Sequence, residues 1–218
     1  EGDEADPERP VLVFSRHTSI LDVFLPILFV ANCGHAKLRY VIKNELKGNT
    51  LLDLVGQRLP NAFIDRLRGD QSRYAIRVLG DDLVPESGVV IYPEGTRATQ
   101  PRRDRAIARL EEAGKNDEAA RARQLDHLLS PRPAGVLMLL DQAPDAQVCF
   151  LAHEGMEQLT GLANLVGGHL QGKSIRVRRT IIAPEAIPDT QEARVEWLWQ
   201  QWETMDRWLN EPVGTADA

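Results

Sequence analysis

Short apolar runs alternate along the chain with segments of helical spacing, and this alternation constrains the fold more than any other feature. The apolar runs predict buried strands at residues 11–15, 38–43, 62–65, 88–92, 147–152 and 174–182. Helices are predicted from residue 18 or 19 and over residues 44–57, 70–80, 134–140 and 192–209. Strands that alternate with helices favour an α/β fold, so we expect a single domain with a central mixed or mostly parallel sheet flanked by helices.

Residues 98–130 differ from the rest of the chain because they are highly charged and rich in alanine. They predict an exposed helical excursion that breaks at Gly114, with Pro131 and Pro133 marking its end. The chain has 218 residues, 43% of them hydrophobic, which is enough for one sizeable core. We therefore expect one domain over residues 1–210, which includes the excursion, and a flexible tail at residues 211–218.

Charge and cysteine content exclude several classes of protein. The net charge of −6 argues against a nucleic-acid-binding protein. Cys33 and Cys149 supply neither a disulfide framework nor a metal-ligand cluster, so we expect no metal. The most apolar stretch, residues 20–31, is too short to span a bilayer and includes an aspartate and a proline. Because the chain begins at Glu1 rather than methionine, we expect a trimmed or excised piece, which leaves open whether an upstream membrane anchor was removed.

The first candidate for chemistry is a histidine with an aspartate five positions later, His17 and Asp22. Histidine can accept a proton near neutral pH, and a carboxylate bonded to its ring fixes the tautomer and supports the imidazolium. Of the five histidines, only His17 has an aspartate at this offset. The alternative is structural: His17 is a surface or capping residue, and Asp22 serves the start of the predicted helix.

The second candidate is the segment Pro93-Glu94-Gly95-Thr96-Arg97, which directly follows a predicted buried strand. Ligands of α/β proteins usually bind at the carboxyl ends of strands. Gly95 permits close backbone approach, Thr96 offers a hydroxyl, and Arg97 can hold a phosphate through two parallel hydrogen bonds. The alternative is an ordinary turn with an ion pair between Glu94 and Arg97. Together, the two segments predict removal of a proton from a hydroxyl on a phosphate-bearing substrate.

Further segments extend these two motifs into an ordered series. The series is His17, Ser19 and Asp22; Lys43, Glu45 and Leu46; Phe63, Ile64 and Arg66; Glu94 to Arg97; and Leu128, Leu129, Pro131, Arg132 and Gly135. With these motifs in this order, the chain resembles the lysophospholipid and glycerol-phosphate acyltransferases, in particular the 1-acylglycerol-3-phosphate acyltransferases. The last motif and the charged helix before it are most similar to the lysocardiolipin acyltransferase branch. The chain departs from the family pattern at Pro60, often a glycine, and at residues 148–153, which lack the proline of the fourth motif.

The resemblance implies a role for each catalytic residue. His17 takes the proton from the glycerol hydroxyl of the acceptor, and Asp22 orients His17. The resulting oxygen attacks the carbonyl carbon of an acyl thioester. No covalent acyl-enzyme and no metal are implied, and the sequence contains no Gly-x-Ser-x-Gly elbow for a serine nucleophile.

The resemblance also implies a set of residues that bind the acceptor phosphate. Arg66 and Arg97 grip the phosphate, and Lys43 is a weaker candidate for the same anionic pocket. The turn residues Glu94, Gly95 and Thr96 shape that pocket, which completes the substrate-binding set. The arginines that follow the turn, Arg102, Arg103 and Arg105, suit either steering of anionic lipid headgroups or a solvated charged face.

From the resemblance we expect an enzyme of phospholipid biosynthesis or remodelling with a glycerol-phosphate acyltransferase-like fold. It would move a fatty acyl group from acyl-CoA or acyl carrier protein, its co-substrate, to 1-acyl-sn-glycerol-3-phosphate, with no other cofactor. Alternative acceptors are another lysophospholipid and glycerol-3-phosphate. A non-catalytic lipid-binding module and a thioesterase are the alternatives from other classes. Expected partners are the two substrates, a membrane surface at the cytoplasmic face and acyl carrier protein.

The tryptophans of the last predicted helix and His153 each allow a structural role instead of a functional one. The last predicted helix carries all four tryptophans, Trp197, Trp199, Trp202 and Trp208. Tryptophan is favoured at membrane interfaces, so membrane contact and core packing with partial exposure are both compatible with this helix. His153 stands beside Glu154, and we expect a surface or loop pair rather than a second base.

Overall fold

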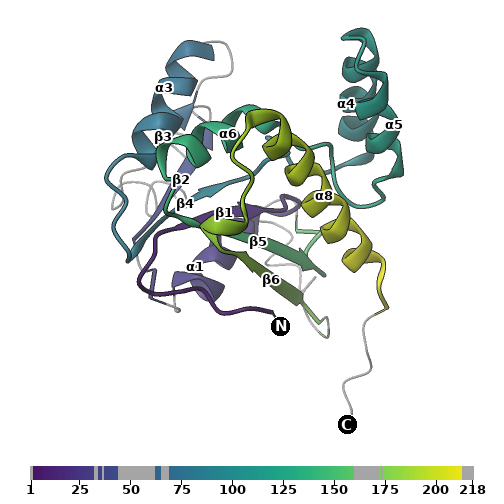
Figure 1. The fold of residues 1–218 in the computed structure, drawn as a ribbon. Helices are drawn as coiled ribbons and strands as arrows, with labels where there is room; N and C mark the ends of the chain where they lie inside the picture. Colours follow the sequence, from purple (N-terminus) through teal and green to yellow (C-terminus); the bar gives the residue numbers. More distant parts are fainter. Residues whose placement is uncertain are drawn as a thin grey trace.

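The computed structural model describes residues 2–31, 34–35, 37–43, 62–64, 69–159, 172 and 174–212, which form an α/β domain around one sheet (Figure 1). The strands are β1 (Val11–Ser15), β2 (Lys37–Lys43), β3 (Ala62–Ile64), β4 (Ser87–Ile91), β5 (Gln147–Glu154) and β6 (Arg176–Ile182). They form a six-stranded sheet in the order β3-β2-β4-β1-β5-β6. Neighbouring strands are parallel except for β5 and β6. The predicted α/β fold with a mixed, mostly parallel sheet is confirmed.

Helices cover both faces of this sheet. The helical segments are η1 (Ile20–Phe24), α1 (Leu25–Phe29), α3 (Gly69–Gly80), α4 (Gln100–Glu112), α5 (Asn116–Gln124), α6 (Pro133–Gln142), η4 (Pro184–Ala186) and α8 (Gln191–Asn210). Helices α3, α6 and α8 contribute to the core on one face, and η1 and α1 to the core on the other (Figure 1). The helix predicted over residues 44–57 lies outside the described residues.

Strand β1 occupies the interior of the sheet and explains the continuous apolar run in the sequence. Leu12 and Phe14 pack into the core beneath α6 and α8, whereas Val11 and Val13 pack into the core beneath α1. All four side chains are fully buried. Successive side chains of a strand point to opposite faces of the sheet. When both faces are covered by helices, every residue of the strand is buried, so its sequence is continuously hydrophobic.

The terminal helix α8 uses its tryptophans for packing. The four indoles are between 0% and 7% exposed, so the core-packing interpretation holds and these rings offer no surface for membrane contact. Trp197 packs edge-on against Phe150 of β5, and Trp199 faces the guanidinium of Arg121 in α5. The two rings are buried on different sides because α8 lies between the sheet and α5. None of the described helices is long and apolar enough to cross a bilayer.

Helices α4 and α5 form a hairpin that projects from the body of the domain (Figure 1). The chain turns between them near Gly114, whose φ is +73°, and no residue of α4 is buried. Arg121 of α5 fixes the hairpin to α8 through ion pairs with Glu196 and Glu203, at 2.6 and 2.7 Å. Apolar packing also holds the hairpin, because Ala122 of α5 belongs to the same core as α8 and Ile107 and Leu110 of α4 pack against that core.

Candidate active site

The loop after β1 leads into η1, and side chains of this segment cap the N-terminus of η1. Ser19 is the N-cap of η1, and its Oγ accepts a hydrogen bond from the backbone N–H of Leu21 at 3.1 Å. The carboxylate of Asp22 reaches back to the N–H of Ser19 at 2.8 Å, which completes a capping box. Asp22 therefore serves the start of the helix, as the structural alternative expected, and the capping box fixes the position of its carboxylate.

The same carboxylate oxygen holds His17. Oδ2 of Asp22 lies 3.0 Å from Nδ1 of His17 and also accepts the backbone N–H of Thr18 at 2.6 Å. Asp22 is fully buried, whereas the His17 side chain is 23% exposed. Because a carboxylate can only accept, Nδ1 is the donor, and Nε2 of the neutral ring is left as an acceptor. The capping and orienting roles considered for Asp22 are thus compatible in one arrangement.

Tyr92 packs against the imidazole ring of His17. The centroids of the His17 and Tyr92 rings are 4.5 Å apart, with the rings inclined at 32°. Burial, and secondarily the charge of Asp22, raises the pKa of Tyr92 well above its usual value, so the phenol is neutral. Tyr92 follows β4 directly and precedes the Pro-Glu-Gly-Thr-Arg turn, which places that turn beside His17.

Backbone hydrogen bonds join the two motifs. The N–H of Ala98, just after the turn, donates to the carbonyl of His17 at 2.7 Å. Within the turn, Gly95 has φ +65° and its N–H donates to the carbonyl of Tyr92 at 2.8 Å. The N–H of Arg132, immediately before α6, donates to the carbonyl of Pro93 at 2.9 Å. The turn is therefore held between the His17 loop and the start of α6.

Glu94 is the buried acid of this turn. It is 1% exposed, and neither carboxyl oxygen makes a hydrogen bond, so the suggested bond to Arg97 is absent. Burial is the main reason that the pKa of Glu94 is raised well above its usual value, and the charge of Asp22 adds to it. Arg16 and the nearby backbone N–H groups of Leu129 and His17 lower the pKa, but burial outweighs them. Burial therefore favours the neutral form of the Glu94 carboxyl group.

This arrangement can be compared with known protein families. Residues 1–155 match the model of the family described as acyltransferase. The chain belongs to this glycerolipid acyltransferase family. Its membership supports acyl transfer to a glycerolipid as the general activity of the enzyme. The comparison with curated proteins found no match, and the comparison with solved structures found none either.

The acyltransferase contains a second histidine that the sequence interpretation placed wrongly. His153 is fully buried rather than on a surface or loop, and its Nε2 lies 3.4 Å from Oδ1 of Asp22. The same nitrogen lies 3.3 Å from the carbonyl oxygen of Arg16. Burial lowers the pKa of His153 below its usual value, so the ring is neutral. Glu154 instead pairs with Arg176, at 3.0 Å.

Arg16 is another buried residue of the site that the sequence did not reveal. It is 3% exposed, and its Nη1 donates to the carbonyl of His153 at 2.5 Å and to Glu157 at 2.8 Å. Both His153 and Arg16 come from the carboxyl ends of neighbouring strands β5 and β1. The available signal was positional: each stands where an apolar strand ends, at the same edge of the sheet as His17.

The structure describes some, but not all, of the remaining residues that were predicted to bind substrate. Lys43 is the last residue of β2 and pairs with Ile64 of β3, so its backbone lies at the same carboxyl edge of the sheet. Arg66 lies outside the described residues. Thr96 and Arg97 are half-buried, and the carbonyl of Arg97 accepts a hydrogen bond from Arg102 at 3.1 Å.

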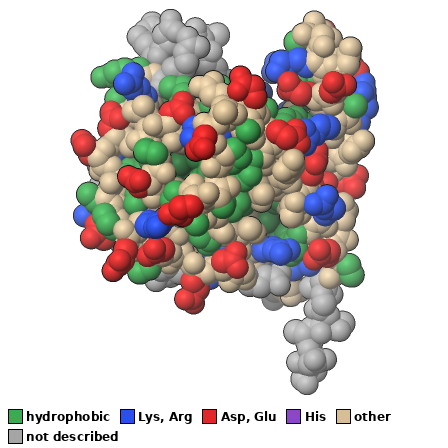
Figure 2. All heavy atoms as spheres, in the orientation of Figure 1, with side chains coloured by type: hydrophobic (Ala, Val, Ile, Leu, Met, Phe, Trp, Pro, Cys, Tyr) green, Lys and Arg blue, Asp and Glu red, His purple; other side chains and the backbone are tan. Residues whose placement is uncertain are grey.

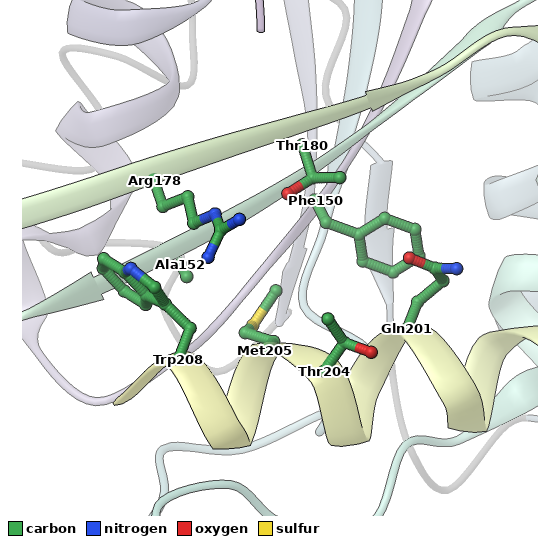
Figure 3. Close-up of a pocket in the computed structure, with 8 residues that line it drawn as sticks. All are labelled: Phe150, Ala152, Arg178, Thr180, Gln201, Thr204, Met205 and Trp208. Atoms are coloured by element: carbon green, nitrogen blue, oxygen red, sulfur yellow. The ribbon is translucent and has the colours of Figure 1, made fainter. Parts of the chain in front are cut away.

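The described residues of this acyltransferase line at least two hollows. One, of about 140 Å³, lies between the turn and α4, and its lining includes Glu94, Thr96 and several arginines. The other lies between α8 and strands β5 and β6 and has a volume of about 20 Å³ (Figure 3). The smaller hollow has room for little more than one water molecule and contains none of the predicted site residues. The described residues include no group of three or more histidine, cysteine, aspartate or glutamate side chains suited to a metal ion.

Proposed function

We propose that this acyltransferase moves a fatty acyl group from acyl-CoA or acyl carrier protein to the free hydroxyl of 1-acyl-sn-glycerol-3-phosphate. The observation that carries the proposal is the hydrogen bond from Nδ1 of His17 to the buried carboxylate of Asp22, beside the Glu94–Arg97 turn. This bond leaves Nε2 of a partly exposed imidazole free to accept a proton.

In the proposed reaction, Nε2 of His17 removes the proton from the acceptor hydroxyl while the hydroxyl oxygen attacks the thioester carbonyl. The tetrahedral intermediate collapses by breaking the carbon–sulfur bond, and the departing thiolate receives the proton from the imidazolium. Asp22 keeps the ring in the required tautomer and stabilises its positive charge. General-base catalysis of this kind accounts for roughly 10²–10⁴-fold of the rate.

The acceptor phosphate is proposed to bind at the carboxyl edge of the sheet. Arg97 and Arg66 supply guanidinium groups, and Lys43 adds a weaker contact. Gly95 and Thr96 shape the pocket, and burial favours the neutral form of the Glu94 carboxyl group, which lessens repulsion of the phosphate. Phosphate recognition by arginine through paired hydrogen bonds is geometrically specific, which favours a phosphorylated acceptor over a neutral glyceride.

The enzyme is proposed to work at the cytoplasmic face of a membrane, where its lipid acceptor resides, and to need no cofactor or metal beyond its thioester co-substrate. The main alternative changes only the acceptor, to glycerol-3-phosphate or a lysophospholipid with another headgroup, such as lysocardiolipin. A panel of acceptors assayed with one labelled thioester separates these cases. A thioesterase would instead release free fatty acid without any acceptor.

The decisive experiment compares wild type with His17→Ala, using purified protein, labelled oleoyl-CoA and lysophosphatidate. We expect the variant to lose at least about a hundredfold in kcat because the general base is absent. His127→Ala is the matched control, since this exposed histidine bonds to Asn210 at the end of α8. Near-full turnover by His17→Ala would overturn the proposal and favour a lipid-binding module or another base.

A further inference from the structure

The larger hollow is lined by arginines that the sequence motifs do not include, apart from Arg132. Arg102, Arg105 and Arg109 come from α4, and Arg132 comes from the segment before α6. Arg97 is not among the residues that line it. The hollow is therefore a second concentration of guanidinium groups next to the Glu94–Arg97 turn.

Helical geometry explains why three of these arginines share the hollow. Positions 102, 105 and 109 are three and four residues apart, so they lie on one face of α4. Arg103, which is off this face, donates instead to the carbonyl of Asp126 at 2.9 Å. In the space-filling view, the projecting hairpin carries basic and acidic side chains side by side (Figure 2).

Two of the arginines in this hollow, Arg105 and Arg109, have no ion-pair or hydrogen-bond partner among the described residues. Among the described residues of the lining, Glu94 is the one acidic side chain, and burial raises the pKa of its carboxyl group. A cluster of like charges is stabilised when an anion from outside is bound among them.

The volume indicates what size of group fits. About 140 Å³ is roughly ten times the 10–15 Å³ that one water molecule needs, so a phosphate group with its hydration fits. Complete small-molecule sites are larger, at about 300–1,000 Å³. The hollow thus suits one charged group of a larger molecule whose remainder lies elsewhere.

We propose that this arginine-lined hollow binds a second phosphate group of a substrate, separate from the phosphate held near Arg97. This inference rests on the proposed acyl transfer. Two sources share the required chemistry: the nucleotide phosphates of a coenzyme A thioester and an additional phosphate on a polyanionic lipid acceptor. Arg105 and Arg109 are the main determinants, with Arg102 and Arg132 completing the ring of guanidinium groups, and Thr96 supplying a hydroxyl.

The test uses the double variant Arg105→Gln/Arg109→Gln, with Arg77→Gln as control, because Arg77 is an exposed arginine on α3 away from the site. Each protein is assayed with oleoyl-CoA and with the oleoyl thioester of N-acetylcysteamine, which carries no phosphate. The acceptors are lysophosphatidate, which has one phosphate, and lysocardiolipin, which has two. Both glutamine substitutions are on exposed positions, so the double variant should remain folded.

Two results would support the inference and identify the source of the phosphate. A rise of about tenfold or more in KM for oleoyl-CoA, with the N-acetylcysteamine thioester unaffected, assigns the hollow to the donor. A similar rise in KM for lysocardiolipin, with lysophosphatidate unaffected, assigns it to the acceptor. Unchanged values for all four substrates would overturn the inference while leaving the acyltransferase activity intact.

A binding measurement separates failure of this inference from failure of the proposed function. Calorimetric titration with inorganic pyrophosphate should show binding to wild type and to Arg77→Gln, and at least about tenfold weaker binding to the double variant. This outcome supports the anion site even if none of the acceptors is acylated. Equal pyrophosphate binding by all three proteins would count against the site whatever the activity.

Discussion

Asp22 holds His17 with the same carboxylate oxygen that closes the start of the helix on which Asp22 lies. Oδ2 is 3.0 Å from Nδ1 of His17 and 2.8 Å from the backbone nitrogen of Ser19. An aspartate fixed by backbone groups cannot swing away from the imidazole without breaking the helix cap. The orientation of the proposed base is therefore coupled to local secondary structure rather than to a flexible side-chain pair.

This coupling predicts two effects of Asp22→Asn. The amide oxygen can still accept backbone N–H groups, but the negative charge that stabilises the imidazolium is lost. We expect kcat to fall by roughly 10²–10⁴-fold, with little change in KM for the acceptor. Stability should fall by no more than about 1 kcal/mol, as for a weakened helix cap. Steady-state kinetics and urea unfolding measure both effects, and activity within tenfold of wild type would contradict the orienting role.

Replacement of His153 should change the acid sensitivity of the fold. Burial lowers the pKa of His153, so the unfolded chain takes up a proton below the ordinary value of 6.5 while the folded protein resists it. The neutral His153 ring therefore contributes stability above pH 6.5, and this contribution is lost as the pH falls. His153→Gln retains an amide near Asp22 but does not titrate. Between about pH 7 and about pH 5, urea unfolding should show a smaller drop in the free energy of unfolding for the variant than for wild type. Equal drops in the two proteins would show that His153 does not take up a proton on unfolding.

The stability difference between Glu94→Gln and wild type should depend on pH in the opposite direction. The pKa of Glu94 is raised above its ordinary value of 4.5, so the folded protein holds this proton more tightly than the unfolded chain. Stability from the neutral carboxyl is present below 4.5 and is lost as pH rises toward the raised pKa. The glutamine variant should thus gain stability relative to wild type between about pH 4.5 and pH 7. A difference that stays constant across this range, measured by chemical denaturation, would show that Glu94 is ionised in the folded protein.

Gly95→Ala tests the turn, and Gly114→Ala provides a matched control. Both glycines have positive φ, at +65° and +73°, so each alanine should cost roughly 1–2 kcal/mol of stability. A Cβ at Gly95 would lie 3.3 Å from Nη1 of Arg132, whereas one at Gly114 would meet nothing within 4 Å. Only Gly95→Ala should also raise KM for the acceptor. Equal losses of stability with unchanged KM in both variants would show that the turn has no part in substrate binding.

Local features of the site could be predicted because they involve residues close together in sequence. The capping box at Ser19 and Asp22 and the bond to His17 span five positions, so helix geometry alone brings them together. The turn after β4 was expected at the carboxyl end of a strand, where the structure places it. The alternation of apolar and helical segments likewise predicted the α/β fold.

Other features of the site depend on which strands pair, and the sequence was ambiguous or misleading there. His153 and Asp22 are 131 positions apart, and they meet only because β5 pairs with β1 in the sheet. The sequence signal at His153 was its neighbour Glu154, which in fact pairs with Arg176. Burial of the α8 tryptophans also depends on a distant contact, since α5 covers one side of that helix.

The sequence by itself determined the elements, the helix cap and the pairing of His17 with Asp22, because these follow from short-range periodicity and hydrogen bonding. Only the tertiary structure decided which titratable groups are buried, and burial raises the pKa of Glu94 and lowers that of His153. It also gathered Arg105 and Arg109 with Arg132 around one hollow. Burial and long-range proximity depend on how strands and helices pack, and packing involves residues that are distant along the chain.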